Sequence, residues 1–343
     1  MKHRAFFWFI LPSLAAMLLF IALPIVSVAI QSLFVEHEQI MIEVENCGPF
    51  GCETEITVDA EATASLREEA PLGRFNGLGT YTNRNHLAFE QVGIAWSETE
   101  TMGEFIGELL NLPFYKALLF TLTFTAVVTP MVLVLGLGFA LAVNALPKVV
   151  KGPTIFVSLL PMIVTPLIGA LILFWMVDAD GIIGATLQRI FDDPNLSLKA
   201  STPLTWIMLI VYGIWSSTPF SFIVFYAGLQ TVPSETLEAA KIDGASRWQA
   251  IRYVIVPYMM PLVVFITLMQ LMDNFRVFEP IVSFQASAKA TSLSWIIFND
   301  LRGGDVQLFG SAAATSMLTI LGVCILLAPV LLRTWADFNR KRA

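Results

Sequence analysis

The sequence is short of charged residues, and this shortage excludes an ordinary soluble domain. Charged side chains make up 14% of its 343 residues, against roughly a quarter in soluble proteins. Hydrophobic residues make up 56%, so a soluble chain of this length would lack the charge needed to keep its surface in water. The apolar residues form long runs separated by polar blocks, a pattern typical of a chain that crosses a bilayer.

Cysteine is also scarce, and three residues are too few for a disulfide scaffold or a four-cysteine zinc site. Cys47 and Cys52 enclose a Cys-Gly-Pro-Phe-Gly-Cys loop within a polar segment. If that segment faces an oxidising compartment, a disulfide between them is the favoured interpretation, with two free thiols as the alternative. Cys324 lies in an apolar run, where we expect a small core residue.

Several catalytic motifs are missing. No Gly-Lys dipeptide occurs, so the chain has no phosphate-binding loop of the G-x-x-x-x-G-K-[ST] type. It has neither a nucleophile elbow nor an evident pair of catalytic carboxylates. His3, His37 and His86 show no metal-ligand spacing, and we expect them in solvated loops. We therefore predict a chain that is not itself an enzyme and that binds no metal or cofactor of its own.

Six apolar segments are long enough, or nearly so, to cross a hydrocarbon core of about 30 Å as helices. They are residues 6–33, 117–146, 155–177, 203–229, 254–273 and 312–332. The fifth is the least regular, because its apolar pattern continues through 277–284. The first follows Lys2 and Arg4 and could be a secretory signal, but it exceeds the ~7–15 apolar residues of a signal, so an uncleaved span is favoured. These segments predict an all-α integral membrane fold.

Acidic and basic residues are segregated between the connecting segments. The two ends of the chain, the turn at 147–152 and the loop at 230–253 contain eleven basic and four acidic residues, a net charge of +7. The remaining segments carry −14. Short cytoplasmic loops are enriched in Lys and Arg. The first set, including both termini, is therefore expected in the cytoplasm.

Two outer segments have features of their own. Residues 34–113 contain Ile40, Ile42, Val44, Ile56 and Val58 in alternation with polar residues, which favours a small β-containing or partly ordered insert. Residues 274–311 contain an apolar patch at 293–298 that is too short to span, and a re-entrant or interfacial helix is expected there.

The segment ETLEAAKIDGASRWQAIRYVIVPYMMP, residues 235–261, predicts a short helix, a sharp turn and a second helix. Ser234 can cap the first helix, and Ser246 can cap the second. Gly244, after Asp243, gives the backbone freedom that a sharp turn needs. On the residues alone, an amphipathic connector at the membrane surface explains the segment equally well.

The string EAAKIDGASRWQ, followed by two prolines, resembles the EAA loop of permease subunits of bacterial ABC importers, in particular their carbohydrate branch. The opening PSL…LPIVSVAIQSLF is similar to the first permease of maltose-type importers. The resemblance covers the membrane core but not residues 34–113. It implies a type I importer permease fold in the bacterial inner membrane, divided into 1–33 (cytoplasmic end and first span), 34–113 (periplasmic insert), 114–333 (core, with a coupling loop at 230–256) and 334–343 (cytoplasmic tail).

The resemblance also implies partners and a coupling site. Glu238, Ala239 and Ala240 would contact a dimer of ATP-binding subunits, where ATP and Mg²⁺ would bind, and Asp243 and Gly244 would form the turn. A second permease subunit and a periplasmic solute-binding protein would complete the complex, surrounded by membrane lipid and without nucleic acid. The implied activity is import of a carbohydrate or sugar-like solute by alternating access.

Polar residues at membrane depth are costly and are therefore candidates for the solute pathway. Hydroxyls, amides and aromatic faces suit a sugar, although Ser and Thr can bond their own helix and amides can join helices. The candidates are Gly213, Ser216, Ser217, Phe220, Thr267, Gln270, Leu271 and Asn274. The resemblance favours Ser216, Ser217, Phe220, Gln270 and Asn274. Just beyond lie Asp273, Arg276 and Glu279, expected to form structural pairs, with contact between Arg276 and an anionic solute as the alternative.

Two other functions fit parts of the sequence. An ion-coupled secondary carrier would be favoured by inverted repeats and by buried acids at mid-membrane, and neither is visible. A scaffold or sensor with an outer domain would explain residues 34–113, but it would leave the segment at 235–261 without a purpose.

Overall fold

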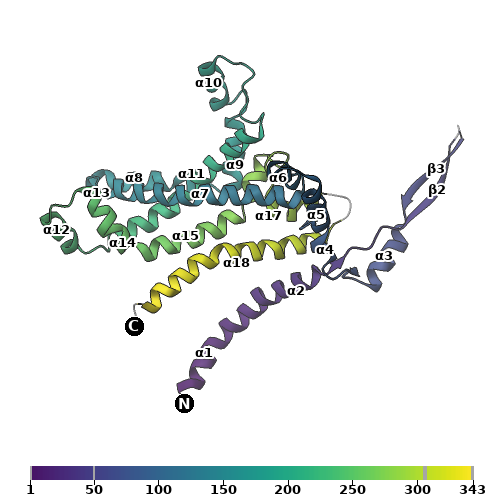
Figure 1. Ribbon diagram of the computed structural model, residues 1–343, viewed down its shortest axis with the longest axis horizontal. Helices are drawn as coiled ribbons and strands as arrows, with labels where there is room; N and C mark the ends of the chain where they lie inside the picture. Colours follow the sequence, from purple (N-terminus) through teal and green to yellow (C-terminus); the bar gives the residue numbers. More distant parts are fainter. Residues whose placement is uncertain (1, 49–50, 304–306, 341–343) are drawn as a thin grey trace. The chain divides into compact units, whose positions relative to one another are not determined.

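The computed structural model describes residues 2–48, 51–303 and 307–340, and it is mostly helical (Figure 1). It divides into two compact units, which are treated separately below. Unit 1 comprises Met1–Lys116 and Ile296–Ile320, and unit 2 comprises Ala117–Trp295 and Leu321–Ala343.

Unit 1 combines one long helical segment with a small α/β insert. Its elements are α1 (Lys2–Met17), the π-helical turn η1 (Leu18–Ala22), α2 (Leu23–Gln31), β1 (Phe34–Val35), β2 (Met41–Gly48), β3 (Gly51–Val58), α3 (Ala60–Glu69), β4 (Arg74–Phe75), α4 (Gly79–Thr82), α5 (Phe89–Glu98) and α6 (Met102–Leu110). The sequence alternation correctly predicted strands, because β2 and β3 form an antiparallel hairpin. Cys47 and Cys52 are partners in its backbone register. Their side chains, and with them the expected disulfide, lie outside the described residues.

The predicted first span is a helix whose apolar side chains are exposed. The stretch Trp8–Gln31 is long and apolar enough to cross a membrane, and none of its most hydrophobic window is buried by the described residues. Such a surface requires an apolar cover in place of water, as a bilayer provides. The π-helical turn η1 ends two residues before Pro24, which cannot donate to the carbonyl four residues earlier, so the helix locally widens around the missing bond.

Unit 2 is a bundle of helices (Figure 1). Its elements are α7 (Pro113–Asn144, whose first turn belongs to unit 1), α8 (Lys148–Ile163), α9 (Pro166–Met176), α10 (Ile182–Phe191), α11 (Thr202–Leu229), α12 (Ser234–Ile242), α13 (Arg247–Ala250), the π-helical turn η2 (Ile251–Ile255), α14 (Val256–Tyr258), α15 (Met260–Phe275) and α16 (Glu279–Ser283). Two helices are divided between the units, α17 (Leu293–Arg302) and α18 (Phe309–Arg340).

The structure agrees with the expected six spans if each of two bent helix pairs is taken as one span. Four helices are long and apolar enough to span, and two bent helix pairs bring the number to six. The pair α8–α9 is bent by 91°. There Thr165, which precedes Pro166, has extended backbone angles (φ −61°, ψ 143°) because proline disfavours a helical residue before it. The pair from α13–α14 to α15 is bent by 71° near Met259, which lies between Pro257 and Pro261.

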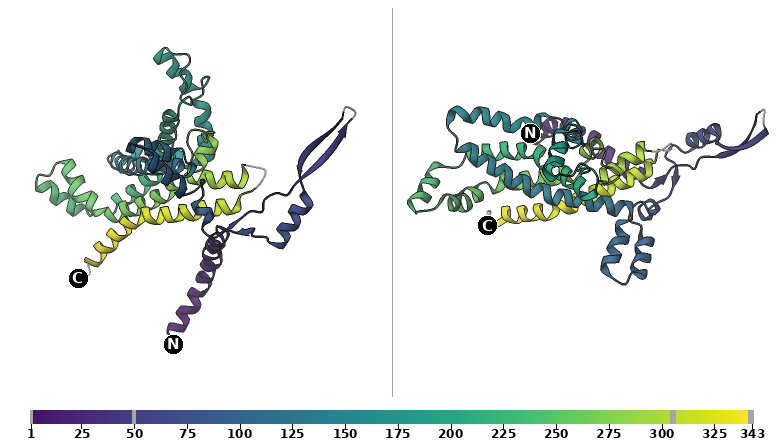
Figure 2. Two further views of the ribbon diagram at one scale, coloured as in Figure 1. Left: turned by 45° about the vertical axis from the view of Figure 1, so that its right-hand side comes forward. Right: turned by 90° about the horizontal axis from the view of Figure 1, so that it is seen from above.

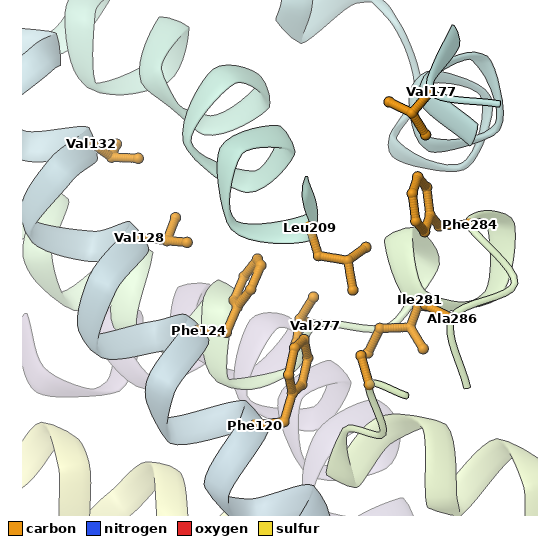
Figure 3. Packing of buried hydrophobic residues seen from close by; sticks show 11 residues of the cluster. Phe120, Phe124, Val128, Val132, Val177, Leu209, Val277, Ile281, Phe284 and Ala286 are labelled. Atoms are coloured by element: carbon orange, nitrogen blue, oxygen red, sulfur yellow. The ribbon is translucent and has the colours of Figure 1, made fainter. Parts of the chain in front are cut away.

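Two clusters of buried residues mark opposite ends of the bundle. The first cluster, drawn in Figure 3, consists of Phe120, Phe124, Val128, Val132, Val177, Leu209, Val277, Ile281, Phe284, Ala286 and Ala290. The second consists of Ala140, Val143, Phe222, Phe225, Leu229, Ile255, Met259 and Ile266. The start of α11 therefore packs near the start of α7, and its end near the end of α7. The ring of Phe120, near the start of α7, lies 5.0 Å from that of Trp206, near the start of α11, measured between centroids, which agrees with this arrangement.

Because α7 and α11 run in parallel, the chain between them must return along the bundle. The bent pair α8–α9 makes this return: Leu159 on α8 packs on the second cluster, and Val177, just after α9, belongs to the first. The second bent pair also connects the clusters, from Ile255 to Val277. Both bent pairs thus act as single crossings of the bundle.

Candidate functional site

A cavity of about 550 Å³ lies inside unit 2 where α8 breaks into α9. It is lined by Phe124, Pro161, Met162, Val164, Pro166, Gly213, Ser216, Ser217, Asp273, Asn274, Arg276, Val277, Glu279 and Pro280. The break at Val164 and Thr165 separates α8 from α9, and Tyr212 of α11 donates to the carbonyl of Pro166 at 2.8 Å directly after it. The lining of the cavity mixes hydroxyls, an amide, apolar side chains and charges, which is the composition of a site for a small polar solute.

Four of the eight predicted pathway residues line this cavity: Gly213, Ser216, Ser217 and Asn274. Gly213 is buried against the ring of Phe124, and a Cβ atom at this position would lie 2.6 Å from that ring. The Ser216 hydroxyl donates to the carbonyl of Gly213 at 3.3 Å. The cavity wall on α11 is therefore made of a glycine and two small hydroxyl side chains.

The other four candidates, Phe220, Thr267, Gln270 and Leu271, are not among the lining residues. The Thr267 hydroxyl donates to the carbonyl of Val263 in its own helix at 2.7 Å. The side-chain amide of Asn274 donates to Thr129 Oγ1 at 3.0 Å and to Gln270 Oε1 at 3.4 Å. Asn274 therefore both lines the cavity and joins α15 to α7.

Three charged residues border the cavity at the end of α15 and just after it: Asp273, Arg276 and Glu279. Arg276 Nη2 lies 3.0 Å from Asp273 Oδ1, so the predicted structural pair forms. More than half of each side chain is exposed, and such a pair contributes little to stability. Glu279 also lines the cavity, and no ion pair to it is found among the described residues. The charged residues thus include one more acid than base.

A second group of polar contacts, which the sequence analysis did not predict, connects two loops of unit 2. One loop precedes α11 and contains Lys199, and the other follows α16 and contains Lys289. Lys199 pairs with Asp178 and lies 3.7 Å from the centre of the Phe174 ring. The Lys289 ammonium donates to the carbonyl of Lys199, and Trp206 Nε1 donates to the carbonyl of Lys289 at 2.9 Å. The hydrogen bond from Lys199 is the main cause of a lowered pKa of the Asp178 carboxyl.

The predicted coupling segment, residues 235–261, has the expected helix, turn and helix. Helix α12 ends in a Schellman motif: the N–H of Gly244 bonds to the carbonyl of Lys241 at 3.0 Å, and the N–H of Ala245 to that of Ala240 at 2.9 Å. Gly244 adopts φ +78°, a left-handed conformation that favours glycine. The Ser246 cap also forms, as a reciprocal capping box with Gln249.

The expected cap at Ser234 is wrong. Helix α12 already includes Ser234, and the flanking residue is Pro233, which makes no side-chain cap. Proline at that position supplies a fixed φ near the helical value without any hydrogen bond.

One edge of the predicted coupling segment is exposed, and the other packs against the bundle. Glu238, Ala239 and Asp243 are exposed, Ala240 is half-buried, and Ile242 is 86% exposed. On the other side, Leu237 and Ile251 pack against the second cluster, where α7 and α11 end. The segment therefore offers a free surface while remaining attached to the ends of two spans.

Unit 1 contains a junction centred on His86, and here the expectation of a solvated histidine is wrong. His86 is fully buried; Asn83 Oδ1 lies 2.8 Å from Nδ1, and Thr315 Oγ1 lies 3.0 Å from Nε2. Nε2 also lies 3.1 Å from the carbonyl oxygen of Ser311, so a hydrogen-bond acceptor faces each ring nitrogen. Burial lowers the pKa of His86 from 6.5, and burial raises the pKa of the nearby Asp300 carboxyl. The Asp300 carboxylate accepts from the Ser311 hydroxyl at 2.6 Å.

The same junction receives the ends of other helices of unit 1. Tyr81 Oη donates to Ser32 Oγ, directly after α2, at 2.6 Å. Tyr115 Oη, in the first turn of α7, donates to the carbonyl of Leu87 at 2.8 Å. The end of the first span and the starts of α7 and α18 are thus tied to one short segment, residues 81–88.

Two further observations concern possible ligands. No group of three His, Cys, Asp or Glu residues suited to a metal occurs within residues 2–48, 51–303 and 307–340. Cys324 is exposed, so the expected core position is wrong.

Comparisons with known proteins support the predicted resemblance to permease subunits of ABC importers. The family model described as "Binding-protein-dependent transport system inner membrane component" matches residues 101–337. A probable ABC transporter permease protein from Pyrococcus horikoshii is 34% identical over 171 residues, which are 49% of this chain and 58% of that protein. The trehalose/maltose transport system permease protein MalF of Thermococcus litoralis is 29% identical over 223 residues, which are 60% of this chain and 70% of the relative.

Among solved structures, the fold is similar to that of a chain in a bacterial ABC transporter involved in the import of the acidic polysaccharide alginate. The TM-score is 0.64, with 17% sequence identity, and the match covers 98% of this chain and 96% of that chain. At this identity the likeness shows the fold alone.

Proposed function

Because the chain belongs to the family of binding-protein-dependent transport system inner membrane components, we propose that it is the permease subunit of an ATP-driven importer. Its solute would be a carbohydrate or sugar-like molecule, carried by alternating access from the periplasm to the cytoplasm. The observation that carries this proposal is the pairing, in unit 2, of a polar cavity with an exposed helix–turn–helix attached to the ends of the same spans.

The cavity supports a hydroxylated solute. Two serine hydroxyls, the Asn274 amide and the Phe124 ring border it, and these groups offer hydrogen bonds and an aromatic face to a sugar ring. A sugar also agrees with the name of the Thermococcus litoralis relative, a trehalose/maltose permease, which matches 60% of this chain.

The coupling segment supports a separate ATPase. In our proposal Glu238, Ala239 and Ala240 contact one of two ATP-binding subunits, which hold ATP and Mg²⁺, and the Asp243–Gly244 turn shapes that contact. A second permease subunit and a periplasmic solute-binding protein complete the complex. Movement of this segment would act on α7 and α11 through Leu237 and Ile251, which pack where those helices end. A rearrangement between two states couples the two sites.

The basic connecting segments support an orientation in the bacterial inner membrane. We place both termini and the coupling segment in the cytoplasm, because their side of the chain carries the excess of Lys and Arg. Residues 34–113 and the charged border of the cavity then face the periplasm.

The experiment uses the tagged full chain, purified with its associated subunits from its native cells and reconstituted in nanodiscs. ATP hydrolysis is measured with and without a panel of neutral, acidic and amino sugars. We expect stimulation by at least one sugar, and its loss in Glu238→Ala. Glu235→Ala, which changes an exposed carboxylate in the same helix, is the control and should retain stimulation. ATP hydrolysis that no sugar stimulates, or full stimulation in Glu238→Ala, would contradict the proposal.

A further inference from the structure

The helical hairpin α5–α6 has an apolar face that no other described residue covers. Phe89 and Trp96 lie two turns apart on α5, and Met102 and Ile106 lie one turn apart on α6, so each pair shares a helix face. Their exposed fractions are 59%, 64%, 62% and 48%. The Trp96 ring packs edge-on against Phe105, 5.2 Å between centroids, and so joins the apolar sides of the two helices. Figure 2 (right) shows the hairpin projecting as two adjacent dark blue helices.

The other side of the hairpin is acidic. Glu104 and Glu108 each follow an exposed apolar residue by two positions, which is about 200° around the helix. Glu98 and Glu108, with Arg84, border a polar pocket of about 430 Å³ at the base of the hairpin. The 22 residues from Phe89 to Leu110 contain five glutamates and no lysine or arginine. The hairpin is therefore amphipathic, with an apolar and an anionic face.

Both ends of the hairpin are fixed to the start of a membrane span. Helix α6 ends at Leu110 and α7 begins at Pro113, with only two residues between. At the other end, Leu87 accepts the hydrogen bond from Tyr115 in the first turn of α7. His86, beside it, contacts Thr315 near the start of α18. Since α7 and α18 are both candidate spans, the base of the hairpin lies where the chain enters the membrane.

We propose that the α5–α6 hairpin lies in the headgroup region of the bilayer as an interfacial anchor. Phe89, Trp96, Met102 and Ile106 face the acyl chains, and the glutamates face water. Tryptophan and amphipathic helices are suited to this depth. Because its charges are all negative, the hairpin prefers zwitterionic phospholipid and is repelled by anionic lipid.

Attachment to the membrane boundary favours lipid over a docked protein. An unattached apolar face on a distant lobe would need a protein to cover it, whereas this face is held within a few residues of two span entrances. The leaflet depends on the proposed orientation, which makes it the periplasmic one, but the immersion of the hairpin does not.

The test measures the depth of nitroxide labels on the full chain in phosphatidylcholine nanodiscs, after replacement of Cys47, Cys52 and Cys324 by serine. Single labels are placed through Met102→Cys, Glu104→Cys, Ile106→Cys and Glu108→Cys. We expect labels at 102 and 106 to be severalfold more accessible to oxygen than to a water-soluble nickel complex, at a depth of about 5–10 Å. Labels at 104 and 108 should show the reverse. A label through Val134→Cys, on an exposed position within α7, is the control for lipid contact in a folded sample.

Two outcomes would overturn the proposal. Equal access of the nickel complex to all four positions means that the apolar face lies in water. Protection of 102 and 106 from both reagents means that protein covers it. In a second arm, half of the phosphatidylcholine is replaced by phosphatidylglycerol. Labels at 102 and 106 should then become more accessible to nickel, and an unchanged or greater depth refutes the preference for zwitterionic lipid.

Discussion

The ring of Phe124 on α7 occupies the space that a side chain at Gly213 on α11 would fill. A Cβ atom at Gly213 would lie 2.6 Å from this ring and 3.4 Å from Val128, so the two parallel helices approach closely at the wall of the cavity. The contact explains why a glycine stands among bulky apolar residues, and it makes Gly213 a determinant of cavity shape.

Gly213→Ala should therefore destabilise the protein and slow solute uptake. Overpacking a tight helix contact costs about 1–3 kcal/mol, and relief can come only from a shift of Phe124 toward the cavity. Thermal unfolding in detergent and an uptake assay measure the two effects. Gly138→Ala, where an added Cβ meets nothing within 4 Å, should not destabilise the protein, since alanine is the better helix former, and should not slow uptake. Phe124→Leu should partly restore the stability lost in Gly213→Ala. If it does not, the Phe124 ring is not the cause of the destabilisation.

The hydrogen bond from Asn274 to Thr129 should appear as a coupling energy between α15 and α7. A double-mutant cycle with Asn274→Leu and Thr129→Val is expected to give about 0.6 kcal/mol, the average for such bonds between membrane helices. Thr267→Val is the matched control, because Thr267 bonds to Val263 in its own helix. That variant should not couple to Thr129→Val. Zero coupling for the Asn274 cycle would remove the proposed link between the helices.

Burial of His86 should make the stability of the protein fall in mild acid. Burial lowers the pKa of this imidazole from 6.5, so below pH 6.5 the unfolded chain binds a proton that the folded protein resists. The loss of stability starts near pH 6.5 and continues until the lowered pKa of the folded protein is reached. The melting temperature, recorded from pH 8 to pH 5, measures it.

Two variants test this assignment. His86→Phe removes the buried imidazole and should therefore flatten the pH dependence of the melting temperature. Asp300→Asn should steepen it, because burial raises the pKa of Asp300 and an acid of this kind is stabilised by protonation. An unchanged slope in His86→Phe would assign the dependence to other groups.

Substitutions at Gly244 should reduce coupling in the order of their tolerance for a positive φ. The left-handed conformation at this position is accessible to asparagine and strained for a β-branched residue. We expect Gly244→Asn to retain most of the sugar-stimulated ATP hydrolysis, Gly244→Ala less and Gly244→Val least. The purified complex provides the measurement. Equal activity of the asparagine and valine variants would mean that the turn geometry does not matter for coupling.

The sequence predicted features whose cause is local. Gly244 and Ser246 could be read directly, because a turn and a cap depend on neighbouring residues. The six apolar segments were recognisable because length alone decides whether a helix can cross. The bend at Pro166 was not predicted, since a proline in a span can be tolerated or can break it, depending on what surrounds it.

The wrong predictions concern the surroundings of side chains, such as those of His86 and Cys324. These surroundings depend on residues that are distant in the sequence or on the membrane. The buried ring of His86 contacts Thr315, which lies 229 positions away in the sequence. No spacing of residues in the sequence predicts this contact. Cys324 was expected in a protein core because it lies in an apolar run. In a membrane, the side of a helix that faces lipid is as apolar as the side that faces protein, so hydropathy cannot tell the two apart. Two of the pathway candidates missed the cavity because of their hydrogen-bond partners: Gln270 is buried against Asn274, and Thr267 bonds to a carbonyl of its own helix.

Because α7 packs along α11 from the first cluster to the second, the two helices would tilt together about the attachment of α7 at residues 81–88. With 32 residues, α7 extends about 48 Å from its first turn. A tilt of about 10° about that end would move the far end by about 8 Å. A small rotation of the pivot thus suffices for a displacement larger than a helix turn at the end where the chain meets Leu237 and Ile251.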